Sequence, residues 1–291
     1  MLSLPSHPAL DSPEEIDAQY NNRALVPEHP QLYEQWQPLC AQVLADFTCH
    51  QDVAYGASQR ERMDIVLPNS AGPHPVLLYI HGGYWMSRSK SDQTFLARAY
   101  AEAGIAFVLV EYDLIPSVGM NDVVYQCRAA TAWLHAHADE YGLDTERFFV
   151  SGHSAGGHLT AMLADTDWAT FCDGPADLIK GGVAISGIYD LTPIRHSYMQ
   201  ETLALSEADV ATNSPQFFKT APRVPLIVAP GGAESDAFRH QSRNLVNTWN
   251  AVNGNCSYLE VPGCNHFTIL SEFSDPESQL AKATMEMIHG T

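Results

Sequence analysis

The sequence has little positive charge, no long apolar run and no basic, apolar leader. It carries 15 Lys and Arg against 34 Asp and Glu, which gives a net charge of −19. Such a surface argues against binding nucleic acid or an anionic membrane. Apolar runs such as residues 105–110 have the length of a strand and are too short to span a bilayer. Because residues 1–15 do not resemble a secretory signal, we expect a cytoplasmic protein.

The cysteines and histidines show none of the spacings that disulfide frameworks or zinc sites require. There is no Cys-x-x-Cys pair and no His-Glu-x-x-His motif. His135, His137 and Asp139 look like a ligand cluster, but they lie in a predicted helix, where residues two apart do not share a face. We therefore expect no metal, no cofactor and free thiols, with Cys264 either lining the site or packing beneath it. The six cysteines are Cys40, Cys49, Cys127, Cys172, Cys256 and Cys264.

Strand-like and helix-like patterns alternate over most of the 291 residues. Such alternation predicts a mainly parallel central sheet with helices on both faces. Residues 1–50 have helix patterns only, so we expect a small N-terminal helical cap segment before a main domain over 51–291, with 187–221 as a lid insertion. The predicted strands are 62–67, 76–80, 105–110, 147–151, 183–186, 226–229 and 256–261, and the predicted helices are 12–20, 31–45, 93–103, 123–141, 155–164, 238–250 and 276–288.

A Gly-x-Ser-x-Gly motif, residues 152–156, lies between a predicted strand and a predicted helix. This context is typical of a nucleophile elbow, in which a sharp turn exposes the serine hydroxyl. Glycine is needed at both flanking positions because a Cβ would collide in so tight a turn. The free N–H groups at the start of the helix point at charge that develops beside Ser154. The motif therefore predicts that Ser154 is the nucleophile of an α/β-hydrolase.

The predicted strand 76–80 is followed at once by His81-Gly82-Gly83-Tyr84-Trp85. A glycine pair in this position resembles the loop that supplies oxyanion donors in lipases and esterases. Acyl transfer places negative charge on a carbonyl oxygen, which preorganised N–H groups stabilise. We predict donors from Gly82, Gly83 and Ala155, whereas His81 shapes the loop and transfers no proton.

In this fold the acid and the base follow the nucleophile along the chain. His266 lies on a loop after the last predicted strand and is the candidate base. Two carboxylates, Glu234 and Asp236, follow the predicted strand 226–229. Glu234 is closer to the strand end and its longer side chain can still reach an imidazole, whereas Asp236 suits the first turn of the next helix. We predict Glu234 as the acid, with Asp236 as the second choice.

These motifs belong to a set of segments spread over most of the chain: Gln19–Arg23, His81–Trp85, Gly152–Leu159, Ser186–Leu191, and Glu234 with Phe238 and Gln241-Ser242. The set resembles the kynurenine formamidase (arylformamidase) group of α/β-hydrolases, whose wider relatives are the hormone-sensitive-lipase-like esterases. The resemblance favours Glu234 as the acid, although members often carry Asp there. It implies hydrolysis of an N-formyl aryl amine, such as N-formylkynurenine, to formate and the free amine. Tyr84 and Trp85 would then offer aromatic surface to the aryl group, or pack under the loop.

Other functions remain open at this level. A carboxylesterase acting on short acyl or aryl esters uses the same triad. A ligand-binding receptor of the same fold would commonly lose a triad member, yet Ser154, Glu234 and His266 are all present. A metal-dependent formamidase lacks its ligand motif here. We expect a small-molecule substrate, no nucleic-acid or membrane partner and, where the chain self-associates, a homodimer.

Overall fold

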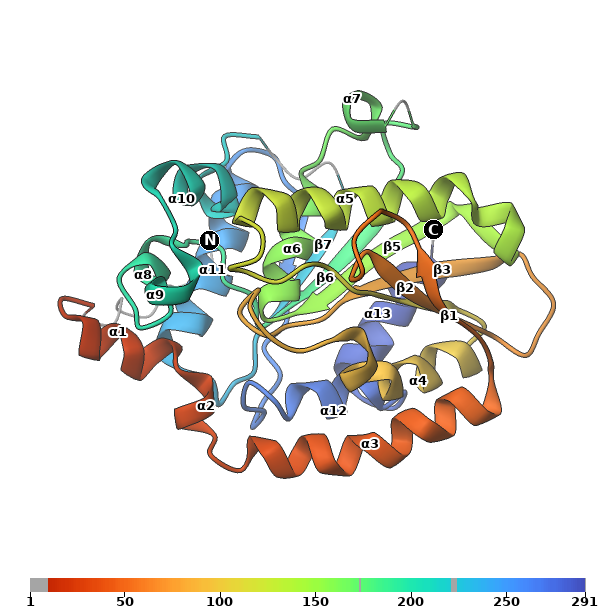
Figure 1. Cartoon of the computed structure of the whole chain (residues 1–291), viewed down its shortest axis with the longest axis horizontal. Helices are drawn as coiled ribbons and strands as arrows, with labels where there is room; N and C mark the ends of the chain where they lie inside the picture. Colours follow the sequence, from red (N-terminus) through yellow and green to blue (C-terminus); the bar gives the residue numbers. More distant parts are fainter. Residues whose placement is uncertain (1–9, 173, 221–223, 291) are drawn as a thin grey trace.

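The computed structural model describes residues 10–172, 174–220 and 224–290. Its centre is an eight-stranded sheet in the order β1-β2-β4-β3-β5-β6-β7-β8 (Figure 1). Strands β1, β2 and β4 pair antiparallel, and every later pair is parallel. The predicted α/β-hydrolase fold is confirmed. The strands are β1 (Thr48–Ala54), β2 (Arg62–Leu67), β3 (His74–Ile80), β4 (Ala106–Val110), β5 (Leu143–His153), β6 (Gly181–Ile185), β7 (Leu226–Ala229) and β8 (Cys256–Tyr258).

Helices cover both faces of the sheet (Figure 1), so its central strands β3 and β4 are buried along their whole length. Successive residues of β3 enter two different cores: Leu78 lies in one, and Leu77 and Tyr79 in the other. The first core is closed by α5 (Met120–Ala136), α6 (Ala155–Ala164) and α11 (Asp236–Ala251). The second is closed by α3 (His29–Asp46), α4 (Ala97–Glu102), α12 (Ile269–Ser274) and α13 (Gln279–His289).

Two parts of the predicted pattern need correction. Strand β1 was not expected, because its residues are mostly polar and exposed at the edge of the sheet and so give no strand pattern. The boundary expected after residue 50 falls inside this strand. The single helix predicted over 276–288 is instead α13, which begins after Ser278 caps the backbone N–H of Ala281, and a separate α12 precedes it.

The N-terminal segment is helical, as predicted, and runs along one side of the sheet (Figure 1). It comprises α1 (Pro13–Tyr20), α2 (Asn22–Leu25) and α3; Ser12 caps α1 with a capping box. The expected lid contains α8 (Thr192–Arg195), α9 (Gln200–Leu203), α10 (Glu207–Asn213) and a 3₁₀ turn, η3 (Pro215–Phe217). Residue 221, the last of this expected lid, and residues 1–9 of the N-terminal segment lie outside the described residues. Among the described helices, none is long and apolar enough to cross a bilayer.

Candidate active site

Ser154, His266 and Glu234 form one hydrogen-bonded relay. The Oγ atom of Ser154 lies 2.9 Å from Nε2 of His266, and Nδ1 of His266 lies 2.5 Å from Oε1 of Glu234. The other carboxylate oxygen of Glu234 accepts the backbone N–H of Gly231 at 3.0 Å, and this side chain is 0% exposed. Both carboxylate oxygens are therefore held in place, which fixes the ring that faces the serine.

The second carboxylate candidate, Asp236, lies elsewhere. It is the first residue of α11, its side chain is 63% exposed, and it pairs with Arg239 at 3.7 Å. This is the position favoured for an acidic residue by the helix dipole. The structure brings Glu234 to the imidazole and leaves Asp236 on the surface.

Ser154 occupies the sharp turn that the motif predicts. Its backbone has φ 60° and ψ −117°, a conformation that costs a non-glycine residue about 1–3 kcal/mol. The turn is held by the sheet, because the N–H of Ser154 donates to the carbonyl of Ile185 on β6 at 2.8 Å. Helix α6 begins at the next residue, Ala155. The turn therefore holds the hydroxyl of Ser154 between β5 and α6, where the N-terminus of α6 faces it.

The predicted oxyanion donors surround this turn. A Cβ on Gly82 would lie 2.8 Å from the carbonyl oxygen of His153 and 3.0 Å from Cβ of Ser154, so the loop backbone touches the nucleophile turn. Gly83 has φ 119°, which a side chain would not tolerate. Within the described part of the chain, the backbone N–H groups of Gly82, Gly83 and Ala155 have no hydrogen-bond acceptor. Three donors beside Ser154 are thus left for a ligand oxygen.

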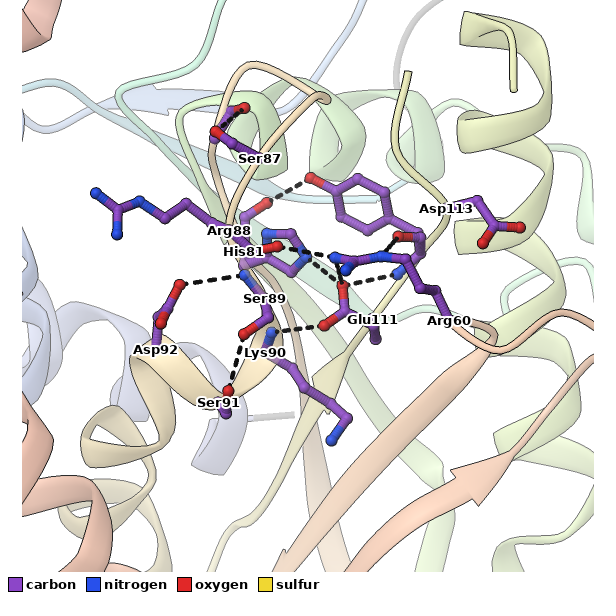
Figure 2. Close-up of polar contacts among 12 residues, drawn as sticks. Arg60, His81, Ser87, Arg88, Ser89, Lys90, Ser91, Asp92, Glu111 and Asp113 are labelled. Carbon is purple, nitrogen blue, oxygen red and sulfur yellow. Dashed lines mark hydrogen bonds and ion pairs between the residues drawn. The ribbon is translucent and has the colours of Figure 1, made fainter. Parts of the chain in front are cut away.

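A buried carboxylate, Glu111, anchors the loop that carries Gly82 (Figure 2). It accepts hydrogen bonds from Nε2 of His81 at 2.9 Å, from the backbone N–H of Lys90 at 3.1 Å and from the guanidinium of Arg60. Burial alone would raise the pKa of Glu111, but the hydrogen bond from His81 and the nearby positive charges outweigh it and lower that pKa.

The ring of His81 is held on both edges. Its Nδ1 lies 2.6 Å from the carbonyl oxygen of Gly82, and it stacks on Tyr112 with centroids 4.4 Å apart. Both ring nitrogens thus face oxygen atoms, which fixes the orientation of the ring. His81 shapes the loop, as predicted, and the sequence patterns did not point to Glu111.

Another histidine, His153, fixes the loop of the catalytic base. Its Nε2 lies 2.7 Å from the carbonyl oxygen of His266, and the two rings are 4.7 Å apart. Burial, followed by the charge that His266 can carry, holds the pKa of His153 well below its ordinary value. The ring of Phe238 packs edge-on against His266 at 4.8 Å. Neither His153 nor Phe238 was predicted from the sequence as a support of the base.

Tyr84 and Trp85 have different surroundings. Tyr84 lines the cleft beside Ser154 together with Tyr33 and Phe267. Trp85 is 0% exposed, and its Nε1 donates to Nδ1 of His158 at 3.2 Å. The expectation that Trp85 offers aromatic surface to a substrate is therefore wrong, because its ring packs in the core under the loop.

The N-terminal segment is joined to the site by hydrogen bonds. The hydroxyl of Tyr84 donates to the carbonyl of Tyr20 at 2.6 Å and accepts from the N–H of Asn22 at 3.1 Å. The hydroxyl of Ser235, next to the acid, donates to the carbonyl of Gln19 at 2.7 Å. The segment around residues 19–23 thus connects the oxyanion loop to the loop of Glu234, and it supplies Asn22 to the cleft.

Other candidate groups lie away from this chemistry. Cys264 is buried and does not line the cleft. His137 stacks on Trp133 at the end of α5, with centroids 4.0 Å apart. No cluster of three or more His, Cys, Asp or Glu side chains suited to a metal ion occurs among the residues that the structure describes.

The fold and the Ser154–His266–Glu234 relay define a serine hydrolase of the α/β-hydrolase class. The family model described as BD-FAE matches residues 63–248. Kynurenine formamidase of Danio rerio is 34% identical over 244 residues, which cover 81% of this chain and 81% of that protein. The chain therefore belongs to the BD-FAE family and, by its relatives, to the kynurenine formamidase group of α/β-hydrolases.

More distant relatives share the architecture. The probable carboxylic ester hydrolase LipM of Mycobacterium tuberculosis is 27% identical over 249 residues, covering 77% of this chain and 57% of that protein. Among solved structures, a putative thioesterase from Silicibacter sp. TM1040 superposes with a TM-score of 0.81 at 27% identity, covering 94% of this chain and 99% of that one.

Proposed function

We propose that this protein hydrolyses N-formyl aryl amides, such as N-formylkynurenine, through a formyl-enzyme on Ser154. The observation that carries the proposal is the complete relay from Glu234 through His266 to Ser154 beside three free backbone donors. The kinship with kynurenine formamidase of Danio rerio supports the choice of substrate.

The reaction follows from the positions of the side chains. His266 takes the proton of Ser154 through Nε2 as Oγ attacks the formyl carbon. The carbonyl oxygen becomes an oxyanion, which the N–H groups of Gly82, Gly83 and Ala155 stabilise. The C–N bond breaks, and His266 gives its proton to the departing aryl amine. Water then attacks the formyl ester with His266 again as base, which releases formate and restores Ser154.

Glu234 acts on the imidazole throughout this sequence. It accepts the N–H at Nδ1 of His266, which directs Nε2 toward Ser154 and stabilises the imidazolium that forms in each step. Because Gly231 occupies its second oxygen, the carboxylate keeps this orientation.

A carboxylesterase acting on short acyl or aryl esters is the second candidate. The mycobacterial relative LipM supports it, and the same groups perform both reactions. The test is kcat/KM of the purified full chain for N-formylkynurenine beside p-nitrophenyl acetate, before and after exhaustive chelation. Preference for the formamide, kept after chelation, supports the proposal. An inert formamide beside an active ester rejects it in favour of the esterase, and loss on chelation points to a metal-dependent formamidase.

A cytoplasmic location is also proposed. All six cysteines fall within the described residues and each is a free thiol, as reducing compartments maintain. Fractionation of cells that express the tagged protein tests this, and recovery outside the cytoplasm would reject it.

A further inference from the structure

Two arginines stand at the mouth of the cleft in a chain of strongly negative charge. Arg23 comes from α2 and Arg88 from the loop after the oxyanion motif. Both line the cleft that contains Ser154, and both also line an open groove that adjoins it. They therefore lie where a substrate held at Ser154 passes from the cleft into the groove. Since the net charge is −19, an anion needs local cations of this kind to approach the site.

Neither guanidinium is neutralised by the protein. Within the described residues, no Asp or Glu oxygen lies within 4.0 Å of Arg23 or Arg88. Arg23 donates from Nη2 to the hydroxyl of Ser87 at 2.7 Å, and the guanidinium of Arg88 lies 3.6 Å from the ring centroid of Tyr33. Other arginines do contact a carboxylate: Arg60, Arg98, Arg147, Arg195, Arg239 and Arg243.

Arg60 lines the same groove as Arg88, but its charge is paired within the protein. Its guanidinium points into the protein and contacts Glu111, whereas the side chain of Arg88 points away from this network (Figure 2). The backbone of Arg88 is nevertheless fixed, because Arg60 donates to its carbonyl oxygen at 2.8 Å. Arg88 has φ 77°, in the left-handed region that non-glycine residues rarely adopt. The protein therefore maintains a costly backbone conformation at the residue that carries the free cation.

We propose that Arg23 and Arg88 form a carboxylate-binding subsite, so that the preferred substrates are aryl formamides with a carboxylate on the amine-side group. This inference rests on the proposed function and narrows its substrate class. The planar guanidinium groups offer several N–H donors that match a carboxylate, and the ring of Tyr33 holds one of them in place. Asp92 is the acidic residue of the adjoining groove, and one of its oxygens already accepts the N–H of Ser89 at 3.2 Å.

The experiment compares substrates that differ only in this charge. N-formylkynurenine is paired with its carboxamide, which keeps the ammonium group and loses the carboxylate. An ester pair, 3-acetoxybenzoate and 3-acetoxybenzamide, is run in parallel. The readout is the ratio of kcat/KM for the anionic member to that for the neutral member. It is measured for the wild-type chain, Arg88→Met, Arg23→Met, the charge-retaining Arg88→Lys and the control Arg98→Met, whose arginine lines a separate surface groove and pairs with Asp46 and Glu102.

We expect the wild type to favour the anionic member, and Arg88→Met to lower the ratio by about 10- to 100-fold, chiefly through KM, which is the range of a charge-assisted hydrogen bond. Arg23→Met should lower it in the same direction, Arg88→Lys should keep part of the preference, and Arg98→Met should keep the wild-type ratio. A ratio that stays within about twofold of wild type in both Met variants overturns the subsite.

The two hypotheses fail separately. If both formamides are inert but the ester ratio depends on Arg88, the formamidase function is wrong and the subsite stands. If the formamides are hydrolysed with a ratio that neither arginine changes, the subsite is wrong and the function stands.

Discussion

Replacing Glu111 by Gln should impair catalysis although this residue does not touch Ser154. The carboxylate accepts from His81, Lys90 and Arg60, and His81 in turn contacts the carbonyl of Gly82. A glutamine has one acceptor oxygen, and its NH₂ group would face another donor. At least one buried N–H is then left without an acceptor, which costs about 1–3 kcal/mol of unfolding free energy.

The effect on rate follows from the position of Gly82. Loss of a complete oxyanion donor lowers kcat by about 10²–10³, so a displaced donor should lower it by about 10- to 100-fold. KM should change little, because the oxyanion exists only in the transition state and the intermediate. We therefore expect Glu111 to act as a positioning residue, with a kcat effect that a loss of stability alone does not produce.

The assay is steady-state kinetics on the preferred substrate at a temperature far below unfolding, together with denaturant unfolding. Asp113→Asn is the matched control: Asp113 is a near neighbour, but its carboxylate accepts from Gln126 and does not contact His81 (Figure 2). It should keep kcat within about twofold of wild type, since it leaves the loop contacts intact. If a folded Glu111→Gln protein retains wild-type kcat, the proposed connection from Glu111 to the oxyanion loop is refuted.

Four further predictions concern other parts of the molecule. Ser154→Ala should lower kcat by about 10⁴-fold or more, and Glu234→Gln should lower it far more than Asp236→Asn; equal losses would contradict the assigned acid. Burial lowers the pKa of His158 to about 4, below the value in the unfolded chain. The neutral His158 therefore contributes its full stability to the folded state above the unfolded-state pKa, and this contribution is lost as the pH falls toward 4. Unfolding free energy should drop by about 2 kcal/mol between pH 7.5 and 5 through this group; an equally steep drop in His158→Gln would reject that origin. Trp85→Phe should cost about 1 kcal/mol of stability through its lost hydrogen bond and leave KM for aryl substrates unchanged; a raised KM would show that the ring contacts substrate.

The catalytic half of the site is predictable because its geometry is imposed locally. A serine in a turn as tight as that of residues 152–156 needs small neighbours. The strand before the motif and the helix after it then identify the turn as a nucleophile elbow. The acid and base then follow from chain order, since the loops after parallel strands meet at one edge of the sheet. Edge strand β1 cannot be predicted in this way, because its residues are mostly exposed and show no alternation of apolar and polar side chains that would indicate a buried face.

The recognition half cannot be predicted in this way, because it is assembled from segments far apart in the chain. Tyr33 reaches the cleft from α3 and Arg23 from α2, and no local sequence pattern predicts that these side chains lie there. Backbone conformation adds a second obstacle: Tyr84 and Trp85 both have positive φ, so the motif that contains them does not tell which ring meets the substrate. Substitutions at Arg23 and Arg88, rather than in the triad, therefore test the choice of substrate, because formamide and ester hydrolysis on this fold use the same triad.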